Sequence, residues 1–368
     1  MTRNIQYKKL GEICDFISGG TPSKSKNEYW KNGNIPWIKI SDFKEKYIKF
    51  SEEKITKIGL ENSSAKILKK GTILYTIFAS VGKVAILDIE ATTNQAIVGI
   101  NLKEDHSIDK DFLYYFLCSI ENNIKKQARG VAQNNINISI LKNVCIPILP
   151  MSFQKNIVKT LNKLENILEN FKQKKLLINS LNKSLFTRMF GNPFYFNKIK
   201  EDNRSFLKDI AIINPTKKEI EYIENNLEIS FVTMADISEN GEINVNNIKK
   251  LEDVKNNFTF FKEGDVLFAK ITPSMENGKG GVAKNLKNNI GFGTTEIHII
   301  RPIRNITNSQ WLYHLTKLPL FRKDAEIHMT GSAGQKRVPT TYLSNFKIKV
   351  PPIELQNKFA ERVEKIEK

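Results

Sequence analysis

Hydrophobic and polar residues follow two kinds of pattern along this chain. The segment 109–127 begins at an aspartate and carries apolar residues three and four positions apart, a spacing that predicts a helix. Glycine-rich segments predict loops at 18–25 and 275–281, because glycine adopts backbone conformations that other residues avoid. Short runs rich in β-branched and aromatic residues predict buried strands at 72–79, 83–89, 265–271 and 296–302. Together these patterns predict an α+β protein.

A long segment in the middle of the chain, 152–191, predicts one continuous helix. It contains no internal glycine or proline and stops at Gly191 and Pro193. One heptad position is apolar throughout, at Ile157, Leu164, Phe171, Ile178 and Leu185. The other seam position holds Leu161, Leu168 and Met189, together with the polar Lys175 and Asn182. A sustained 3.5-residue period is typical of a coiled coil. The alternative is a solvated spacer, which would leave these apolar side chains in water.

The second half of the chain repeats the first at an offset of about 200 residues. Four short matches occur in the same order: 7–13 with 205–211, 37–43 with 231–237, 69–77 with 262–270, and 111–117 with 310–316. The longest match closes each copy, at 130–154 and 331–356. There the offset stays at 202 for Gln133/Gln335, Leu141/Leu343, Asn143/Asn345, Pro150/Pro352 and Gln154/Gln356. These matches indicate a duplication of one α+β unit of roughly 150 residues.

The second copy begins the same helix as the first. Under the 202 offset, Phe153, Ile157, Leu161 and Leu164 match Leu355, Phe359, Val363 and Ile366. We expect the two helices to pair antiparallel, which gives the chain pseudo-twofold symmetry. The second helix stops at the equivalent of Asn166, so we expect the rest of the first helix to lack an intramolecular partner and to be covered by another chain. The residues concerned are Phe171, Ile178, Leu185 and Met189.

Charge is the first indication of function. The chain is 40% hydrophobic and 26% charged, which excludes a disordered protein. Its 57 Lys and Arg against 39 Asp and Glu give a net charge of +18, typical of a protein that binds a polyanion. The charge is densest at 151–200, where ten basic residues accompany two acidic ones. The alternative is a lysine-rich coding bias without functional meaning.

The sequence gives no support for several kinds of chemistry. Its three cysteines lie far apart, and its four histidines lack metal-ligand spacing. No phosphate-binding loop motif is present, and the segments 192–194 and 291–295 only weakly resemble a methyltransferase motif and a cofactor loop. No apolar stretch has the length of a signal peptide or of a membrane span of about 20 residues. We therefore expect a soluble, cytoplasmic, non-catalytic chain without a metal or cofactor.

The order of these motifs resembles the DNA-specificity subunit of type I restriction–modification systems. The motifs are LGEICDFISGGTPS (10–23), IPWIKISDF (35–43), KKGTIL (69–74) and the closing segments Gly130–Gln154 and Gly331–Gln356. The resemblance covers essentially the whole chain and implies two tandem target-recognition domains separated by long coiled-coil helices. The implied domains are 1–151 and 192–352, each followed by a spacer helix, at 152–191 and at the shorter 353–368.

The same resemblance implies the partners. The chain would read double-stranded DNA and dock methyltransferase subunits and restriction subunits, which are ATP-dependent endonucleases. S-adenosylmethionine would bind the methyltransferase and ATP the restriction subunit, so this chain itself would hold no cofactor. We expect the uncovered helix seam to bind either the methyltransferase or a second copy of this chain. The expected partner-binding residues are Ile157, Leu161, Leu164, Leu168, Phe171, Ile178, Leu185, Phe359, Val363 and Ile366.

A DNA reader needs basic side chains for phosphates and hydrogen-bond donors for base edges. In the first copy the candidates are Lys24, Lys26, Lys39, Lys44, Arg129, Gln133, Asn134 and Asn135. In the second copy they are Lys270, Lys279, Lys284, Gln335, Lys336 and Arg337. The alternative for any one of them is a solvated loop residue.

Two other functions compete with a specificity subunit. One is a non-catalytic coiled-coil adaptor with nonspecific nucleic-acid affinity, which the duplicated domains disfavour. The other is a DNA-modifying enzyme of unrecognised type, which the missing catalytic motifs disfavour. Because the loops 18–25 and 213–219 share little, the two domains should read different half-sites, about 10 bp apart on one face of the duplex.

Overall fold

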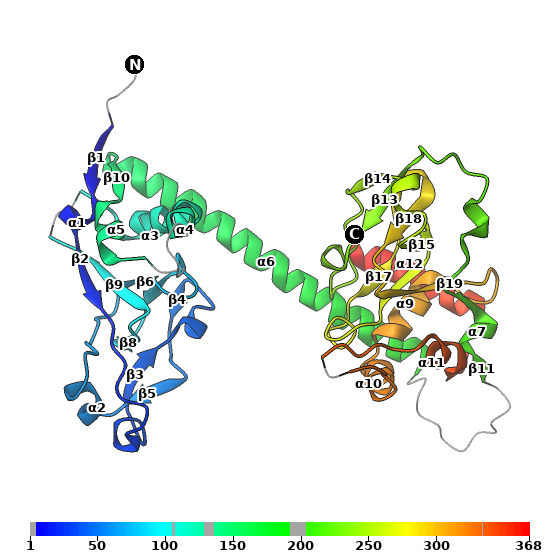
Figure 1. The fold of residues 1–368 in the computed structure, drawn as a ribbon, viewed down its shortest axis with the longest axis horizontal. Coiled ribbons are helices and arrows are strands. Elements are labelled where there is room, and N and C mark those ends of the chain that lie inside the picture. Colours follow the sequence, from blue (N-terminus) through cyan, green and yellow to red (C-terminus); the bar gives the residue numbers. More distant parts are fainter. Residues whose placement is uncertain (1–4, 105–106, 129–135, 192–203, 333) are drawn as a thin grey trace. The chain divides into compact units, whose positions relative to one another are not determined.

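The computed structural model describes residues 5–104, 107–128, 136–191, 204–332 and 334–368. The chain forms two compact units, Met1–Leu168 and Glu169–Lys368. The division falls within one long helix, α6 (Met151–Phe190), which confirms the continuous helix predicted at 152–191 (Figure 1).

The first unit is built on β-strands that form three sheets. The five-stranded sheet has the order β2 (Cys14–Ser18), β9 (Ile97–Leu102), β6 (Ile73–Thr76), β7 (Val84–Leu87) and β4 (Tyr47–Ile48). The three-stranded sheet has the order β5 (Glu53–Ile55), β3 (Ile35–Ile38) and β8 (Thr92–Thr93). The third pairs β1 (Gln6–Lys9) antiparallel with β10 (Cys145–Ile148), directly before α6. Strands β6 and β7 confirm the strands predicted at 72–79 and 83–89, and they are shorter than those runs.

Helices cover this sheet core. They are α1 (Leu10–Ile13), α2 (Lys57–Glu61), α3 (Lys110–Ser119), α4 (Glu121–Ala128) and α5 (Ile138–Asn143), with the short 3-10 helices η1 (Asn27–Tyr29) and η2 (Ile40–Asp42). The prediction of a single helix at 109–127 is wrong. The helix is interrupted at Ile120, whose ψ of −1° departs from the helical value near −42°. Apolar residues of α3 nevertheless pack into the core, as their spacing predicts.

The second unit repeats this plan. One sheet pairs β11 (Ser205–Phe206) with β20 (Lys347–Ile348). The second sheet has the order β12 (Ala211–Ile213), β19 (Ile297–Pro302), β16 (Val266–Ala269) and β17 (Gly280–Val282). The third has the order β14 (Ile248–Lys250), β13 (Glu228–Val232), β18 (Ile290–Gly293) and β15 (Thr259–Lys262). Its helices are α7 (Leu207–Ile210), α8 (Leu251–Val254), α9 (Ser309–Lys317), α10 (Pro319–Ile327), α11 (Thr340–Asn345) and α12 (Ile353–Glu367), with η4 (Lys217–Ile220), η5 (Met234–Asp236) and η6 (Lys287–Asn289). Strands β16 and β19 confirm those predicted at 265–271 and 296–302.

Strand pairing confirms the duplication. In the first unit β6 lies antiparallel between β7 and β9, as β16 lies between β17 and β19 in the second. Strand β3 runs parallel to β8, and its counterpart β13 runs parallel to β18. A carboxylate after each of these strands accepts a backbone N–H: Asp42 from Lys39 at 2.9 Å, and Asp236 from Thr233 at 2.9 Å. Both copies therefore turn the chain in the same way after this strand.

A buried glutamine ties the start of α6 to the first unit. The Gln154 side chain donates from Nε2 to the carbonyl oxygens of Ser107 (2.7 Å) and Leu149 (2.8 Å). Its Oε1 accepts from the backbone N–H of Asp109 at 2.8 Å. Because Asp109 caps α3, this one side chain links the two helix starts.

The second unit has the same latch at the start of α12. Gln356 Nε2 donates to the carbonyl oxygens of Ile306 (2.9 Å) and Pro351 (2.8 Å), and Oε1 accepts from the N–H of Asn308 at 3.1 Å. Asn308 caps α9. Both glutamine side chains are inaccessible to solvent, so the aligned Gln154 and Gln356 are structural counterparts.

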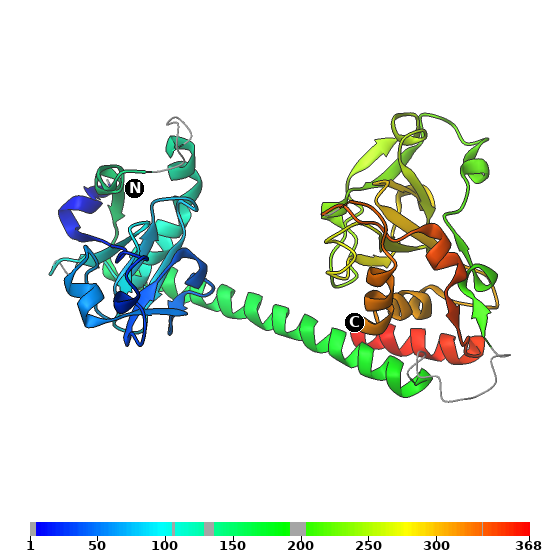
Figure 2. The ribbon, with the colours of Figure 1, turned by 60° about the horizontal axis from the view of Figure 1, so that its bottom comes forward.

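Helix α12 packs against the C-terminal part of α6 (Figure 2). The Phe359 ring centroid lies 5.5 Å from that of Phe186 and 5.3 Å from that of Phe190. Asn182 donates to Glu367 at 3.2 Å. Contacts advance along α12 as they retreat along α6, so the two helices are antiparallel, as predicted.

The register of this pairing corrects one expectation. The prediction that Leu185 and Met189 lack an intramolecular partner is wrong, because both pack against the core of the second unit, to which α12 contributes Phe359 and Val363. Ile178 is half-buried.

The apolar side chains in the middle of α6 remain exposed. Leu164 is 50% exposed, Leu168 61% and Phe171 62%. Ile157 packs partly against the first core, and Leu161 is half-buried. On α12, Ile366 is half-buried.

Candidate nucleic-acid interface

Two tryptophans fix the loop that carries the first candidate lysines. Gly19 and Gly20 lie so close to neighbouring backbone that a Cβ would collide with it, which explains the glycine pair. The Trp37 indole donates to the Gly20 carbonyl at 3.0 Å, and the Trp30 indole donates to the Ser23 carbonyl at 3.1 Å. The two rings meet edge to face, with centroids 4.9 Å apart. The backbone of the loop that carries Lys24 is therefore fixed by these two hydrogen bonds.

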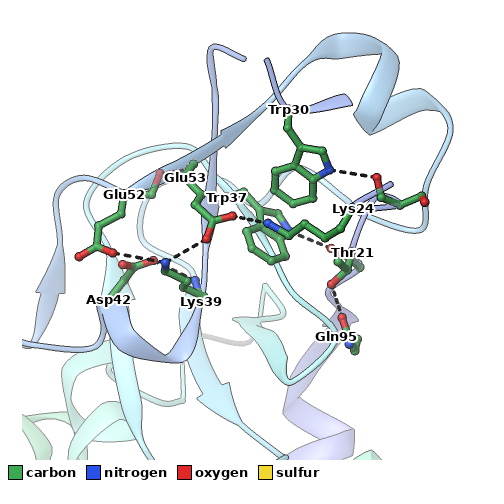
Figure 3. Close-up of polar contacts among 12 residues, drawn as sticks. Thr21, Lys24, Trp30, Trp37, Lys39, Asp42, Glu52, Glu53 and Gln95 are labelled. Atoms are coloured by element: carbon green, nitrogen blue, oxygen red, sulfur yellow. Dashed lines mark hydrogen bonds and ion pairs between the residues drawn. The ribbon is translucent and has the colours of Figure 1, made fainter. Parts of the chain in front are cut away.

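Lys24 begins a row of five alternating charges, of which Figure 3 shows Lys24, Glu53, Lys39 and Glu52. Its Nζ contacts Glu53 Oε2. The other oxygen of Glu53 lies 3.0 Å from Lys39 Nζ, which also lies 3.3 Å from Glu52 Oε2. Glu52 Oε1 lies 3.3 Å from Lys44 Nζ. We call Lys24, Glu53, Lys39, Glu52 and Lys44 the alternating row.

All the carboxylates in this row are held in the charged form. The hydrogen bond from Lys39, followed by that from Lys44, lowers the pKa of Glu52. The hydrogen bond from Lys24, followed by that from Lys39, lowers the pKa of Glu53. The bond to Glu53 raises the pKa of Lys39. The row therefore combines two ionised carboxylates with three lysines.

An aromatic surface supports one end of the row. Lys24 Nζ lies 3.4 Å from the centroid of the Trp30 ring and 4.8 Å from that of Trp37, within the range of a cation–π interaction. Thr21 contacts Gln95 beneath the same loop (Figure 3). Lys24 thus has a defined position although its side chain is 55% exposed.

The other candidates of the first unit are not part of this row. Lys26 donates to the Tyr29 hydroxyl at 3.0 Å, and this bond raises the pKa of Lys26. The remaining candidates lie outside the described residues: Arg129, Gln133, Asn134 and Asn135.

In the second unit, candidate residues gather around Glu296. Arg337 binds its carboxylate through two nitrogens, Nε and a terminal nitrogen, each at 2.9 Å. The Arg337 guanidinium also donates to the Gln335 carbonyl at 3.0 Å. Val338 N–H donates to the Lys270 carbonyl at 2.9 Å, so the two segments run side by side. Burial lowers the pKa of Lys270, and nearby Glu296 opposes this effect.

The other candidates of this unit, Lys336, Lys279 and Lys284, lie in different surroundings. Lys336 lies in the same segment as Arg337, and its carbonyl accepts from the Thr272 N–H at 3.0 Å. Lys279 donates to the Met234 carbonyl at 2.8 Å. Lys284 lies at the opposite end of the β16–β17 ladder from Lys270 and is exposed. The structure therefore brings Lys270 and Arg337 together and leaves Lys284 apart from them.

A further charged cluster in this unit is partly buried and stabilises the fold. Arg301 donates to buried Asp265 through two nitrogens, each at 2.7 Å, and to Glu219 at 2.6 Å. Lys262 lies 2.7 Å from Glu219. Arg301 and Asp265 are 15% and 2% exposed, so this cluster supports the fold.

Reasoning from the sequence missed the acidic members of the surface clusters. Glu52, Glu53 and Glu296 each bind a predicted basic residue. The adjacent Glu52 and Glu53 were a visible signal, but only the pairing of Glu53 with Trp37 across β5 and β3 brings them to Lys39.

Two of the described histidines, His298 and His314, are buried in the second unit. His298 hydrogen-bonds Asn214 at 3.0 Å and the Val338 carbonyl at 2.8 Å, and burial lowers its pKa to about 4. Burial lowers the pKa of His314 to about 3. Within the described ranges, no group of three or more His, Cys, Asp or Glu side chains could hold a metal ion. In the same part of the chain, no helix has both the length and the apolar composition needed to cross a membrane.

Comparison with known proteins finds one matching family and several relatives. The family described as "Type I restriction modification DNA specificity domain" matches residues 2–180 and 200–368. The EcoAI specificity subunit of Escherichia coli is 44% identical over 153 residues, covering 41% of this chain and 26% of the relative. The EcoEI specificity subunit of Escherichia coli is 42% identical over 166 residues, covering 42% and 27%. The MjaVIII specificity subunit of Methanocaldococcus jannaschii is 23% identical over 380 residues, covering 98% and 85%.

A solved structure shares the fold. The type I restriction-modification system S subunit from M. genitalium aligns with a TM-score of 0.55 and 17% identity, covering 100% of this chain and 91% of that chain. The matched segments of the EcoAI and EcoEI subunits make up about a quarter of those two proteins. With both of its units matched, the chain belongs to the family of type I restriction modification DNA specificity domains.

Proposed function

We propose that this chain is the sequence-specific DNA-binding subunit of a type I restriction–modification complex. The observation that carries the proposal is the double match to a DNA specificity domain, in a chain with a net charge of +18. The names of the EcoAI and EcoEI relatives as specificity subunits support it. Each unit would read one half of a bipartite target.

The basic side chains of each unit would make the DNA contacts. Lys24, Lys39 and Lys44 would contact phosphates in the first unit, because ammonium groups bind phosphate oxygens without reading sequence. Arg337 would contact DNA in the second unit, where its planar guanidinium suits two acceptors on one guanine. Lys270 beside it would add positive charge.

We assign no catalytic step to this chain. Methyl transfer would take place on methyltransferase subunits that bind S-adenosylmethionine, and cleavage on restriction subunits that use ATP. The role of this chain would be to hold those subunits at the DNA sequence that it recognises.

The exposed middle of α6 would dock the methyltransferase subunits. Leu164, Leu168 and Phe171 are each at least half exposed. Burying such a side chain contributes roughly 1.5–3 kcal/mol, so covering all three would stabilise an assembly substantially. The same surface could instead pair with a second copy of this chain, which light scattering would reveal.

Binding assays test the proposed function. The purified chain, alone and co-expressed with its methyltransferase, is titrated against labelled duplexes by fluorescence anisotropy between 50 and 200 mM salt. We expect the logarithm of the affinity to fall linearly with that of the salt concentration, because bound phosphates release counterions. We also expect one sequence to bind far more tightly than the others in the presence of the methyltransferase.

Two results would contradict this function. Equal affinity for every duplex, in both states, would favour the adaptor alternative with nonspecific nucleic-acid affinity. Methyl transfer or cleavage by the purified chain alone would contradict the non-catalytic assignment.

A further inference from the structure

We propose that Glu52 and Glu53 suppress binding to DNA of random sequence by occupying the lysines of the first unit, so that only DNA that makes additional contacts remains tightly bound. This inference rests on the proposed DNA-binding function and assigns a role to two acidic side chains within that site. The two glutamates would lower the affinity for phosphate in general. The cognate sequence would compensate for separating them from the lysines.

The geometry of the alternating row supports this role. Each of the four carboxylate oxygens contacts an ammonium group, and the three distances beyond the shortest contact are 3.0, 3.3 and 3.3 Å. A carboxylate offers an ammonium group the same kind of anionic oxygen that a phosphate offers. Lys24, Lys39 and Lys44 are thus already bound in the free protein.

The row can open when DNA arrives. The side chains of Lys24, Lys44 and Glu52 are 55%, 62% and 47% exposed, and ion pairs at such exposed positions are weak. Cognate DNA adds hydrogen bonds to base edges, and a random duplex adds few. Opening the row costs the same for both, so it lowers both affinities by the same factor, and cognate binding, which is tighter, persists at concentrations where random binding is lost.

The fold of this region does not depend on the two carboxylates. Strand β5 is held by backbone pairing with β3, from Ile35 with Ile55 to Trp37 with Glu53. The loop that carries Lys24 is held by the indoles of Trp30 and Trp37. The row differs in this from the buried Arg301–Asp265 pair of the second unit. Its carboxylates therefore contribute charge more than structure.

The test compares two double variants of the full chain in complex with its methyltransferase. The first, Glu52→Gln with Glu53→Gln, removes both charges of the row. The matched control, Glu61→Gln with Glu90→Gln, removes two exposed charges from the same unit outside the row. Glu61 also pairs with a lysine, Lys57 at 3.8 Å, so the control releases an ammonium group as well. The first probe is a random-sequence duplex, which requires no knowledge of the target, and the second is a duplex with the sequence that the wild-type complex methylates.

We expect the row variant to bind the random duplex at least about tenfold more tightly near 0.1 M salt, which corresponds to about one additional phosphate contact. The slope of log affinity against log salt should become steeper by about 1 to 3, because up to three lysines are released. The control should change the affinity less than about threefold and leave the slope unchanged. The single variant Glu52→Gln, which opens two of the four contacts, should fall between them.

Three results would overturn the inference. One is a row variant that behaves like the control. Another is unchanged random binding with weaker binding to the methylated target, which would mean that the glutamates read a base. The third is a loss of thermal stability relative to the control without a gain in affinity, which would make the row structural. Failure of wild-type and variant complexes alike to bind any duplex would refute the proposed function itself.

Discussion

Replacing Gln356 by methionine tests what fixes the start of α12. Methionine is close in size to glutamine but cannot make the three hydrogen bonds to the backbone of Ile306, Pro351 and Asn308. Each buried group left without a partner costs about 1–3 kcal/mol. Three such groups predict that the second unit loses at least about 3 kcal/mol of unfolding free energy.

The duplicated latch provides a mirror experiment. Gln154→Met removes the equivalent bonds in the first unit and should destabilise that unit by a similar amount. Gln173→Met is the control, because Gln173 lies exposed on α6 and bonds only Glu169, at 2.9 Å, among the contacts in the described structure. Its effect should stay within about 0.5 kcal/mol.

The assay must report on the two units separately. Urea unfolding followed by hydrogen-exchange mass spectrometry does so, because peptides from α3 and α9 come from different units. Gln356→Met should shift the α9 peptides to lower urea and leave the α3 peptides unchanged, and Gln154→Met should do the reverse. A loss below about 1 kcal/mol, or equal shifts of both units, would refute the reasoning.

Three further predictions follow from buried and exposed side chains. Burial lowers the pKa of His314 to about 3, so between pH 6.5 and 3 only the unfolded chain takes up this proton and the protein becomes less stable as the pH falls. Because of His314, the wild-type protein should lose about 2 kcal/mol of unfolding free energy between neutral pH and pH 5, and His314→Phe should remove this loss. Urea unfolding at both pH values measures the difference, and a variant with an unchanged pH dependence would contradict the prediction. Phe359→Ala should cost about 3–5 kcal/mol and expose α12 to hydrogen exchange, whereas slow exchange at wild-type stability would mean that α12 is held by other contacts. Replacing Leu168 and Phe171 by glutamate should weaken methyltransferase binding without unfolding either unit, measured by light scattering and thermal melting; wild-type assembly would show that the partner docks elsewhere.

Local patterns in the sequence predicted four of the strands, the long helix α6 and the duplication. The β-branched runs became β6, β7, β16 and β19, because a short apolar run with turn signals on both sides is a property of the segment itself. The matched Gln154 and Gln356 make equivalent hydrogen bonds in the two units. The helix break at Ile120 was not predictable, because the apolar spacing continues across it.

The register of the contacts between distant segments was not predictable. Apolar spacing marked Leu185 and Met189 as seam residues but did not show that α12 covers them. The same heptad count omitted Phe186, which is 1% exposed, because a helix of 3.6 residues per turn drifts away from a strict seven-residue repeat. The alternating row was missed for a related reason. Only the pairing of β3 with β5 places two glutamates beside lysines that were identified by charge alone.

Methylome sequencing of cells that carry this chain with its methyltransferase tests the central claim most directly. The account predicts one methylated sequence in two unlike halves, with centres about 10 bp apart, because two different units read one face of the duplex. Exchanging the first unit for that of another family member should change one half and leave the other intact. A continuous or palindromic methylated sequence, or a pattern that persists without this chain, would contradict the account.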